Sequence, residues 1–298
     1  MMKIPRPIRR YLVHPIEATA AFFAYWFFAL LPVDLASAVG GWLGRTIGPR
    51  LPLSRRAVNN LTRAYPEKSP REIAAIVRGM WNNLARVAAE YPHLGEFNIE
   101  GDDRRVEVVG AEYVHLLRDD GKPGIFVSAH LGNWEIGSLS ATQLGVPLDR
   151  VYRAANNRLV EWLYKHGRNA IKGELIRKGP AGVRPILRTF KEGRHLAMMV
   201  DQKMNDGIAV PFFGRDAMTA PALAELAYKF DCPVVPAFVE RLKGAHFRLN
   251  VFPPMDLERT DDRHASVAAN MAKINAVIEG QVRARPEQWL WLHNRWPD

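Results

Sequence analysis

The chain has 298 residues and a formal net charge of +10, with 48% apolar and 10% aromatic residues. This apolar content excludes a largely disordered protein, and the length fits one α/β domain with an appendage. The excess positive charge predicts an anionic partner such as nucleic acid, phospholipid, a phosphorylated substrate or an acidic protein. A single cysteine, Cys232, excludes a disulfide framework and a thiolate zinc site, and its place before an apolar strand predicts core packing.

The first 47 residues differ in character from the rest. An apolar, aromatic-rich run over residues 18–33 follows four basic residues, Lys3, Arg6, Arg9 and Arg10. A helix over this run spans about 24 Å, which is short of the roughly 30 Å hydrocarbon core of a bilayer. The pattern leaves open a short spanning helix, an interfacial helix, a cleaved signal peptide or a buried core helix. We predict a basic segment and membrane-anchor helix over residues 1–47, followed by an α/β domain over residues 48–298.

Alternating helix and strand patterns follow in the second region. A capping box, Ser69-Pro70-Arg71-Glu72, begins a predicted helix over residues 70–90. Further helices are predicted over 111–119, 219–230 and 267–278, and strands over 106–110, 124–130, 195–201, 232–240 and 247–254. This order predicts an α/β fold with a central, mostly parallel or mixed sheet flanked by helices on both faces.

A histidine ends the predicted strand "GIFVSAH", and a glutamate follows it five positions later. His130 and Glu135 are separated by Leu-Gly-Asn-Trp, which can turn the chain into a helix that begins near Glu135. A carboxylate there can orient the imidazole and stabilise its protonated form, so that His130 acts as a general base. The spacing alone leaves open two helix-capping polar residues. It does not favour a metal site, because none of the nine histidines forms an HExxH motif.

Four blocks of the sequence carry a resemblance. They are "VSAHLGNWEIGS", "VYRAANNRLVEWLYKHGRN", "MMVDQKMNDGIAVPFFGRDAMTAPALAELAYKF" and "PEQWLWLHNRW". Together they resemble the bacterial lipid A biosynthesis acyltransferase family, the lauroyl and myristoyl late acyltransferases. The resemblance extends over nearly the whole chain.

The resemblance implies a reaction, a donor and an acceptor. The implied enzyme transfers an acyl chain from an acyl carrier protein thioester to a hydroxyl of a Kdo-modified, phosphorylated lipid A precursor. It works on the cytoplasmic side of the bacterial inner membrane. We predict no metal or nucleotide cofactor, because the sequence has neither a P-loop nor a Rossmann glycine pattern. The family's His-x4-Asp/Glu motif falls on His130 as base and Glu135 as its partner. This chain has Glu where the broader superfamily often has Asp.

Candidate substrate-binding residues occur in the second block. Arg153 and Arg158 are suited to phosphate or oxyanion binding, although either is also typical of a solvated surface. The resemblance places the "YR..NN" block near the site, which adds Asn156 and Asn157.

The third block adds three candidates. Asp201 ends a predicted strand, where it can orient Arg153 or the acceptor headgroup, or simply cap a turn. Phe212 and Phe213 can line an acyl groove or pack the core.

A basic segment between residues 151 and 195 has seven Arg and four Lys against three Glu, a net charge of +8. It is suited to acceptor phosphates, membrane lipid and the acidic carrier protein, and we predict no nucleic-acid partner because no nucleic-acid module is recognisable. Two alternatives stay open: the same chemistry on another glycolipid with acyl-CoA as donor, and a non-enzymatic membrane lipid-binding or assembly protein.

Overall fold

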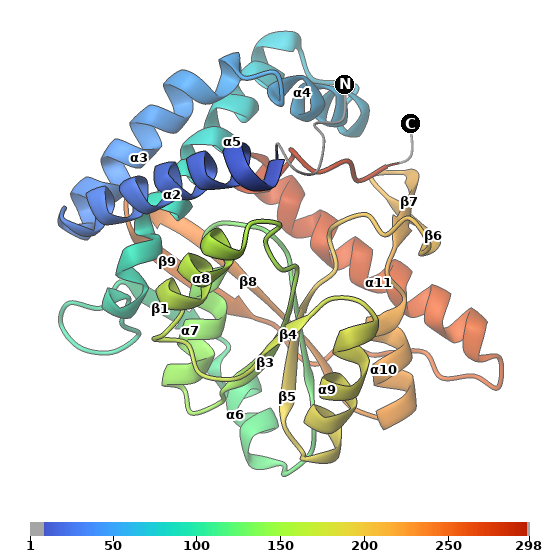
Figure 1. Ribbon diagram of the computed structural model, residues 1–298. Coiled ribbons are helices and arrows are strands. Elements are labelled where there is room, and N and C mark those ends of the chain that lie inside the picture. The colour runs from blue at the N-terminus through green and yellow to red at the C-terminus, as the bar shows by residue number, and fades with distance from the viewer. Residues whose placement is uncertain (1–8, 297–298) are drawn as a thin grey trace.

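A seven-stranded sheet forms the centre of the molecule (Figure 1). The computed structural model describes residues 9–296. The strand order across the sheet is β1-β9-β8-β2-β5-β3-β4. The strands are β1 (Val106–Val109), β2 (Ile125–Ser128), β3 (Leu148–Tyr152), β4 (Leu175–Arg177), β5 (His195–Met199), β8 (Val234–Lys243) and β9 (His246–Val251).

Most neighbouring strands run parallel, and β8 and β9 pair in the antiparallel direction. The mostly parallel, mixed sheet predicted from the sequence is therefore confirmed. Strands β2 and β5 are neighbours in which Ser128 lies opposite Met199. The residues that follow these two strands consequently leave the sheet side by side at its carboxyl edge.

Helices cover both faces of the sheet, as predicted. Side chains of β2 alternate between two cores, with Ile125 and Val127 in one and Phe126 in the other, because successive residues of a strand point to opposite faces. The first core also holds side chains from α4 (Ser54–Ala64), α5 (Pro70–Glu90), α9 (Pro180–Lys191), α10 (Ala222–Phe230) and α11 (Arg263–Ala284). The second core includes α6 (Ala111–Asp119) and α7 (Glu135–Gln143).

The predicted start of α5 is confirmed in detail. The Glu72 backbone N–H donates to Ser69 Oγ, and the Ser69 N–H donates to the Glu72 carboxylate at 2.9 Å. This reciprocal cap satisfies amides that the first turn of a helix leaves without partners.

The N-terminal region forms two helices, α2 (His14–Ala29) and α3 (Val33–Ile47), after a short π-helix, η1 (Arg9–Val13). Helix α3 packs closely on α5: a Cβ at Gly44 would lie 2.2 Å from the Trp81 carbonyl oxygen, so only glycine fits there. Within residues 9–296, none of the helices is both long and apolar enough to cross a membrane. The predicted anchor is therefore not supported; Lys3 and Arg6 of its basic segment lie outside the described residues.

Several elements have no counterpart in the sequence prediction. The basic segment contributes β3, β4, α9 and α8 (Arg158–Gly167). A two-stranded hairpin, β6 (Ile208–Phe212) and β7 (Arg215–Thr219), lies outside the main sheet. Short 3-10 turns complete the structure at η2 (Gly48–Arg50), η3 (Tyr91–Glu96) and η4 (Pro286–Gln288).

Candidate active site

The loop after β2 places His130 at the carboxyl edge of the sheet. Gly132 turns the chain with φ +59°, and a Cβ there would lie 2.4 Å from the Val239 carbonyl oxygen. The Gly132 N–H donates to the Gln288 carbonyl at 3.1 Å, and the Leu290 N–H donates to the His130 carbonyl at 3.2 Å. The C-terminal segment therefore fixes the backbone of the histidine loop.

Asp201 is the hydrogen-bond partner of His130. The His130 Nδ1 lies 2.9 Å from Asp201 Oδ1, and the His130 backbone N–H donates to Oδ2 at 2.9 Å. The β2–β5 register explains the contact, since each residue lies two positions beyond the paired Ser128 and Met199. Trp289 Nε1 also donates to Asp201 Oδ2, at 2.8 Å. Asp201 therefore orients the imidazole through Nδ1 and leaves Nε2 as the atom for a substrate proton.

Burial and charge have opposite effects on the pKa of His130. Burial lowers the pKa of the imidazole, but the Asp201 carboxylate, its hydrogen bond and the more distant Glu135 outweigh burial and raise the pKa above its ordinary value. Burial likewise raises the pKa of Asp201, yet the His130 charge and the hydrogen bonds from His130 and Trp289 lower it to about 2. Asp201 is thus ionised at neutral pH, and the imidazole is a stronger base than in solution.

Glu135 has a different partner from the one expected. Both of its oxygens accept from Arg168, with Arg168 Nε 2.8 Å from Oε2. Glu135 begins α7, whereas Arg168 directly follows α8, and both side chains are largely buried. The Arg168 guanidinium also lies over the rings of Tyr91 and Tyr164, at 5.7 and 5.6 Å from their centroids. The charge of Glu135 helps to raise the pKa of His130. Asp201 forms the hydrogen bond to the imidazole that we expected of Glu135.

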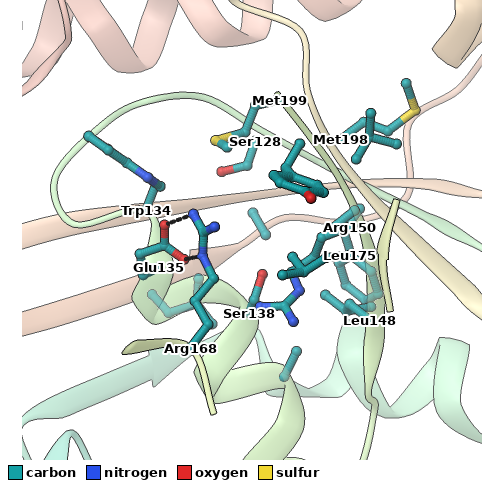
Figure 2. Close-up of a pocket in the computed structure, with 18 of the residues that line it drawn as sticks. Ser128, Trp134, Glu135, Ser138, Leu148, Arg150, Arg168, Leu175, Met198 and Met199 are labelled. Carbon is teal, nitrogen blue, oxygen red and sulfur yellow. Dashed lines mark hydrogen bonds and ion pairs between the residues drawn. The ribbon is translucent and has the colours of Figure 1, made fainter. Parts of the chain in front are cut away.

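A narrow cavity lies between α7 and the sheet (Figure 2). Trp134, Glu135 and Arg168 line it next to the histidine loop, and Figure 2 shows Arg150 and Ser138 lining the same space. Most of the remaining lining is apolar, including Val114, Phe126, Ala141, Leu148, Leu175, Ala197, Met198, Met199, Ala237, Leu249 and Val251. The lining is thus mostly apolar, with the Glu135–Arg168 pair next to the histidine loop.

The residues predicted from the second block lie in two environments. Arg153, Asn156 and Arg158 are exposed beyond the carboxyl end of β3. Asn157 is buried: its amide donates to the His14 carbonyl at 2.6 Å, and its oxygen accepts from the Leu159 N–H at the start of α8. The polar groups of Asn157 are thus used for capping and for holding α2, which differs from the predicted substrate contact.

Phe212 and Phe213 lie away from the cavity. They are buried among the rings of Tyr65, Trp291 and Trp296, and neither lines the space beneath α7. The β6–β7 hairpin turns both rings into the first core, and the acyl groove expected of this pair stays a prediction. The alternative of core packing is the one observed.

Residues that sequence reasoning did not single out complete the site. Arg168, Arg150 and Trp289 each contact the site or its cavity, and His293 lies close enough for the charges of Asp201 and His130 to affect its pKa. Burial lowers the pKa of His293 to about 4. Trp289 and His293 belong to the block "PEQWLWLHNRW", so the resemblance could have pointed to them as site residues. Nothing in the sequence distinguishes Arg150 from the basic residues near it. Within residues 9–296, no cluster of three or more His, Cys, Asp or Glu side chains is arranged to hold a metal ion.

The fold and the buried His–Asp pair beside an apolar cavity are typical of an α/β enzyme. Residues 8–298 match the family described as bacterial lipid A biosynthesis acyltransferase. The chain therefore belongs to this family and is an acyltransferase.

Individual relatives are similar over most of their length. The chain is 27% identical to a lipid A biosynthesis acyltransferase of Haemophilus influenzae, covering 89% of this chain and 82% of that protein. It is 28% identical to the lipid A biosynthesis myristoyltransferase of Escherichia coli, over 89% of this chain and 81% of that protein. It is also 28% identical to the lipid A biosynthesis lauroyltransferase of the same organism, over 91% and 88% of the two chains.

Proposed function

We propose that the protein transfers a fatty acyl chain from an acyl carrier protein thioester to a hydroxyl of a Kdo-modified lipid A precursor. The observation that carries the mechanism is the 2.9 Å contact between His130 Nδ1 and Asp201, next to an apolar cavity. Family membership and the names of the relatives support the acceptor class. No protein nucleophile is required, since the acceptor hydroxyl itself attacks the thioester.

The transfer is a single displacement with one proton moved twice. The acceptor hydroxyl donates its proton to His130 Nε2 while its oxygen attacks the thioester carbonyl carbon. Asp201 stabilises the imidazolium that forms, as its ionised carboxylate already faces Nδ1. When the tetrahedral intermediate collapses, the carbon–sulfur bond breaks and the imidazolium returns the proton to the departing thiolate. The products are an ester and the free thiol of the carrier.

Glu135 and Arg168 support this step from the cavity side. Arg168 is held by two hydrogen bonds to Glu135 and by two aromatic rings, so its guanidinium is fixed before substrate binds. A fixed cation near His130 favours the negative charge that develops on the carbonyl oxygen. The negative charge of Glu135 in turn favours the imidazolium. We assign the pair to charge stabilisation and the cavity beneath α7 to the acyl chain of the donor.

We place the enzyme at the cytoplasmic face of the bacterial inner membrane, as an interfacial protein. Large apolar side chains are exposed on α2 and on the neighbouring α8, including Phe23, Trp26, Leu30 and Trp162. Phe22 and Trp162 stack at 5.6 Å, which joins the two helices into one apolar surface. Aromatic residues beside basic ones favour the headgroup region of a bilayer.

The exposed basic side chains of residues 151–195 provide the second contact. Arg153, Arg158, Lys178 and Arg184 are exposed, and within residues 9–296 they have no ion-pair partner. We assign this surface to the phosphates of the acceptor and to the acidic carrier protein, because opposite charge steers association.

The test is an assay of the detergent-purified protein with acyl carrier protein thioesters and a tetra-acylated Kdo-lipid A precursor, read by mass spectrometry. We expect one added acyl mass, with the rate of the His130→Ala variant at least about 100-fold lower. A glycolipid acylated from acyl-CoA instead would favour the related acyltransferase. A folded His130→Ala variant with an unchanged cellular effect would favour a lipid-binding protein.

A further inference from the structure

Arg150 places a cation with spare hydrogen-bond donors inside the cavity. It lies in the middle of β3, is 8% exposed and lines the space beneath α7. Its Nη2 donates to the carbonyls of Ile171 and Gly173 at 3.3 and 3.4 Å. Its Nε and Nη1 are buried and have no hydrogen-bond partner within the described part of the chain. Buried guanidinium groups are normally paired, so these two donors require an explanation.

The nearby carboxylates already accept hydrogen bonds from residues other than Arg150. Both oxygens of Glu135 accept from Arg168. Asp149 is next to Arg150 in sequence, but its carboxylate accepts from Thr189, Arg194 and the Glu174 N–H. The cavity wall thus carries two guanidiniums and one carboxylate, which leaves one positive charge unbalanced. Such a group favours a ligand that brings an oxygen acceptor.

The surroundings restrict what that ligand can be. Tyr152, Arg150 and Leu148 occupy alternate positions of β3 and all line the cavity, so they form one wall. Arg150 lies two residues below Tyr152, or about 7 Å from the carboxyl edge at roughly 3.3 Å per residue. Apart from Arg150, the Glu135–Arg168 pair, Ser128, Ser138 and Tyr152, the side chains of the lining are apolar. A small anion would match the guanidinium and not the apolar wall, whereas a hydrocarbon chain with one oxygen substituent matches both in polarity.

We propose that Arg150 forms a subsite for an oxygen substituent on the acyl chain, so that the cavity prefers a hydroxy- or oxo-substituted chain to a plain chain of equal length. This inference rests on the assignment of the cavity to the acyl chain under the proposed function. Arg150 Nε and Nη1 donate to the substituent, and Ser138 faces the same cavity from α7. Arg150 is thereby a specificity residue that takes no part in the proton transfer.

The experiment uses unreactive acyl amides of pantetheine with the full-length protein. One probe carries a plain tetradecanoyl chain, and its matched isomers carry a single hydroxyl at successive carbons. Binding is measured from the increase in Tm as each probe is titrated. We expect at least one hydroxylated isomer to bind about tenfold more tightly than the plain probe. We expect Arg150→Met to remove this advantage and the exposed control Arg104→Met to keep it.

A second variant protects the experiment against misfolding. Arg150→Met loses the contacts to Ile171 and Gly173, so Arg150→Gln, which keeps an amide donor, is measured in parallel; either folded variant should show a reduced preference. Equal or weaker binding of every hydroxylated isomer by the wild type overturns the inference while the acyl cavity stands. Preference that persists in both variants also overturns it. If no acyl probe binds at all, the cavity assignment under the proposed function fails together with this inference.

Discussion

The two sides of the site differ in how completely their polar groups are paired. On the sheet-edge side, Asp201 accepts from the His130 ring, the His130 backbone and Trp289. On the cavity side, both oxygens of Glu135 accept from Arg168, and two donors of Arg150 have no partner among residues 9–296. A network whose polar groups are all paired fixes the side-chain geometry before substrate binds. A network with unpaired donors can still form hydrogen bonds to a ligand. The comparison separates the residues of the reaction from those that select its substrate.

The largest effect is expected at Asp201. Asp201→Asn should lower the maximal rate by roughly 10³- to 10⁴-fold, because an amide neither stabilises the imidazolium nor fixes the required tautomer. The rate of the wild type should rise with pH through a midpoint above 6.5, since the base acts when deprotonated and its pKa is raised. In the variant that midpoint should move to lower pH. Asp119→Asn, an exposed change of the same kind, is the control, and an unshifted pH profile in Asp201→Asn would argue against the assignment.

A smaller effect on rate but a clear one on stability is expected at Arg168. Arg168→Met leaves the Glu135 carboxylate buried without its partner, which should cost about 3–5 kcal/mol of unfolding free energy. The double variant Glu135→Met and Arg168→Met should recover much of the loss. Arg188→Met breaks an exposed pair with Glu174 and should change the unfolding free energy by less than about 1 kcal/mol. Denaturant unfolding measures all three, and equal losses in the two single variants would contradict the buried-pair interpretation.

The smallest effect is expected at Trp289. Trp289→Phe keeps an aromatic ring but removes the hydrogen bond to Asp201, so the rate should fall by several-fold to about tenfold. Trp291→Phe provides a matched control, because Trp291 is equally buried and its Nε1 donates to the Pro286 carbonyl instead. Both should lose similar stability. Steady-state kinetics should show a lower kcat for Trp289→Phe alone, and equal losses of kcat would mean that the indole acts only through packing.

Local sequence patterns could predict most residues of this site. They could not predict which carboxylate pairs with His130. The strand before His130 and the strand before Asp201 are both readable as apolar runs with a polar residue at the end. That they are neighbours follows from the sheet order, which depends on packing between elements far apart in the chain. Glu135 is close in sequence to His130, and that nearness favoured the wrong partner for the imidazole. Strand β3 was missed because its Asp149 and Arg150 interrupt the apolar pattern, although both are buried.

The hydrogen bonds between residues 288–290 and the histidine loop have a consequence for the synthesis of the protein. Residues 288–290 contact the backbone of Gly132 and His130, and Trp289 completes the partners of Asp201. A ribosome adds these residues about 160 positions after His130. A nascent chain therefore has both members of the His–Asp pair long before it has the segment that fixes them. Activity should appear only once residues 288–290 have been synthesised and have left the ribosome.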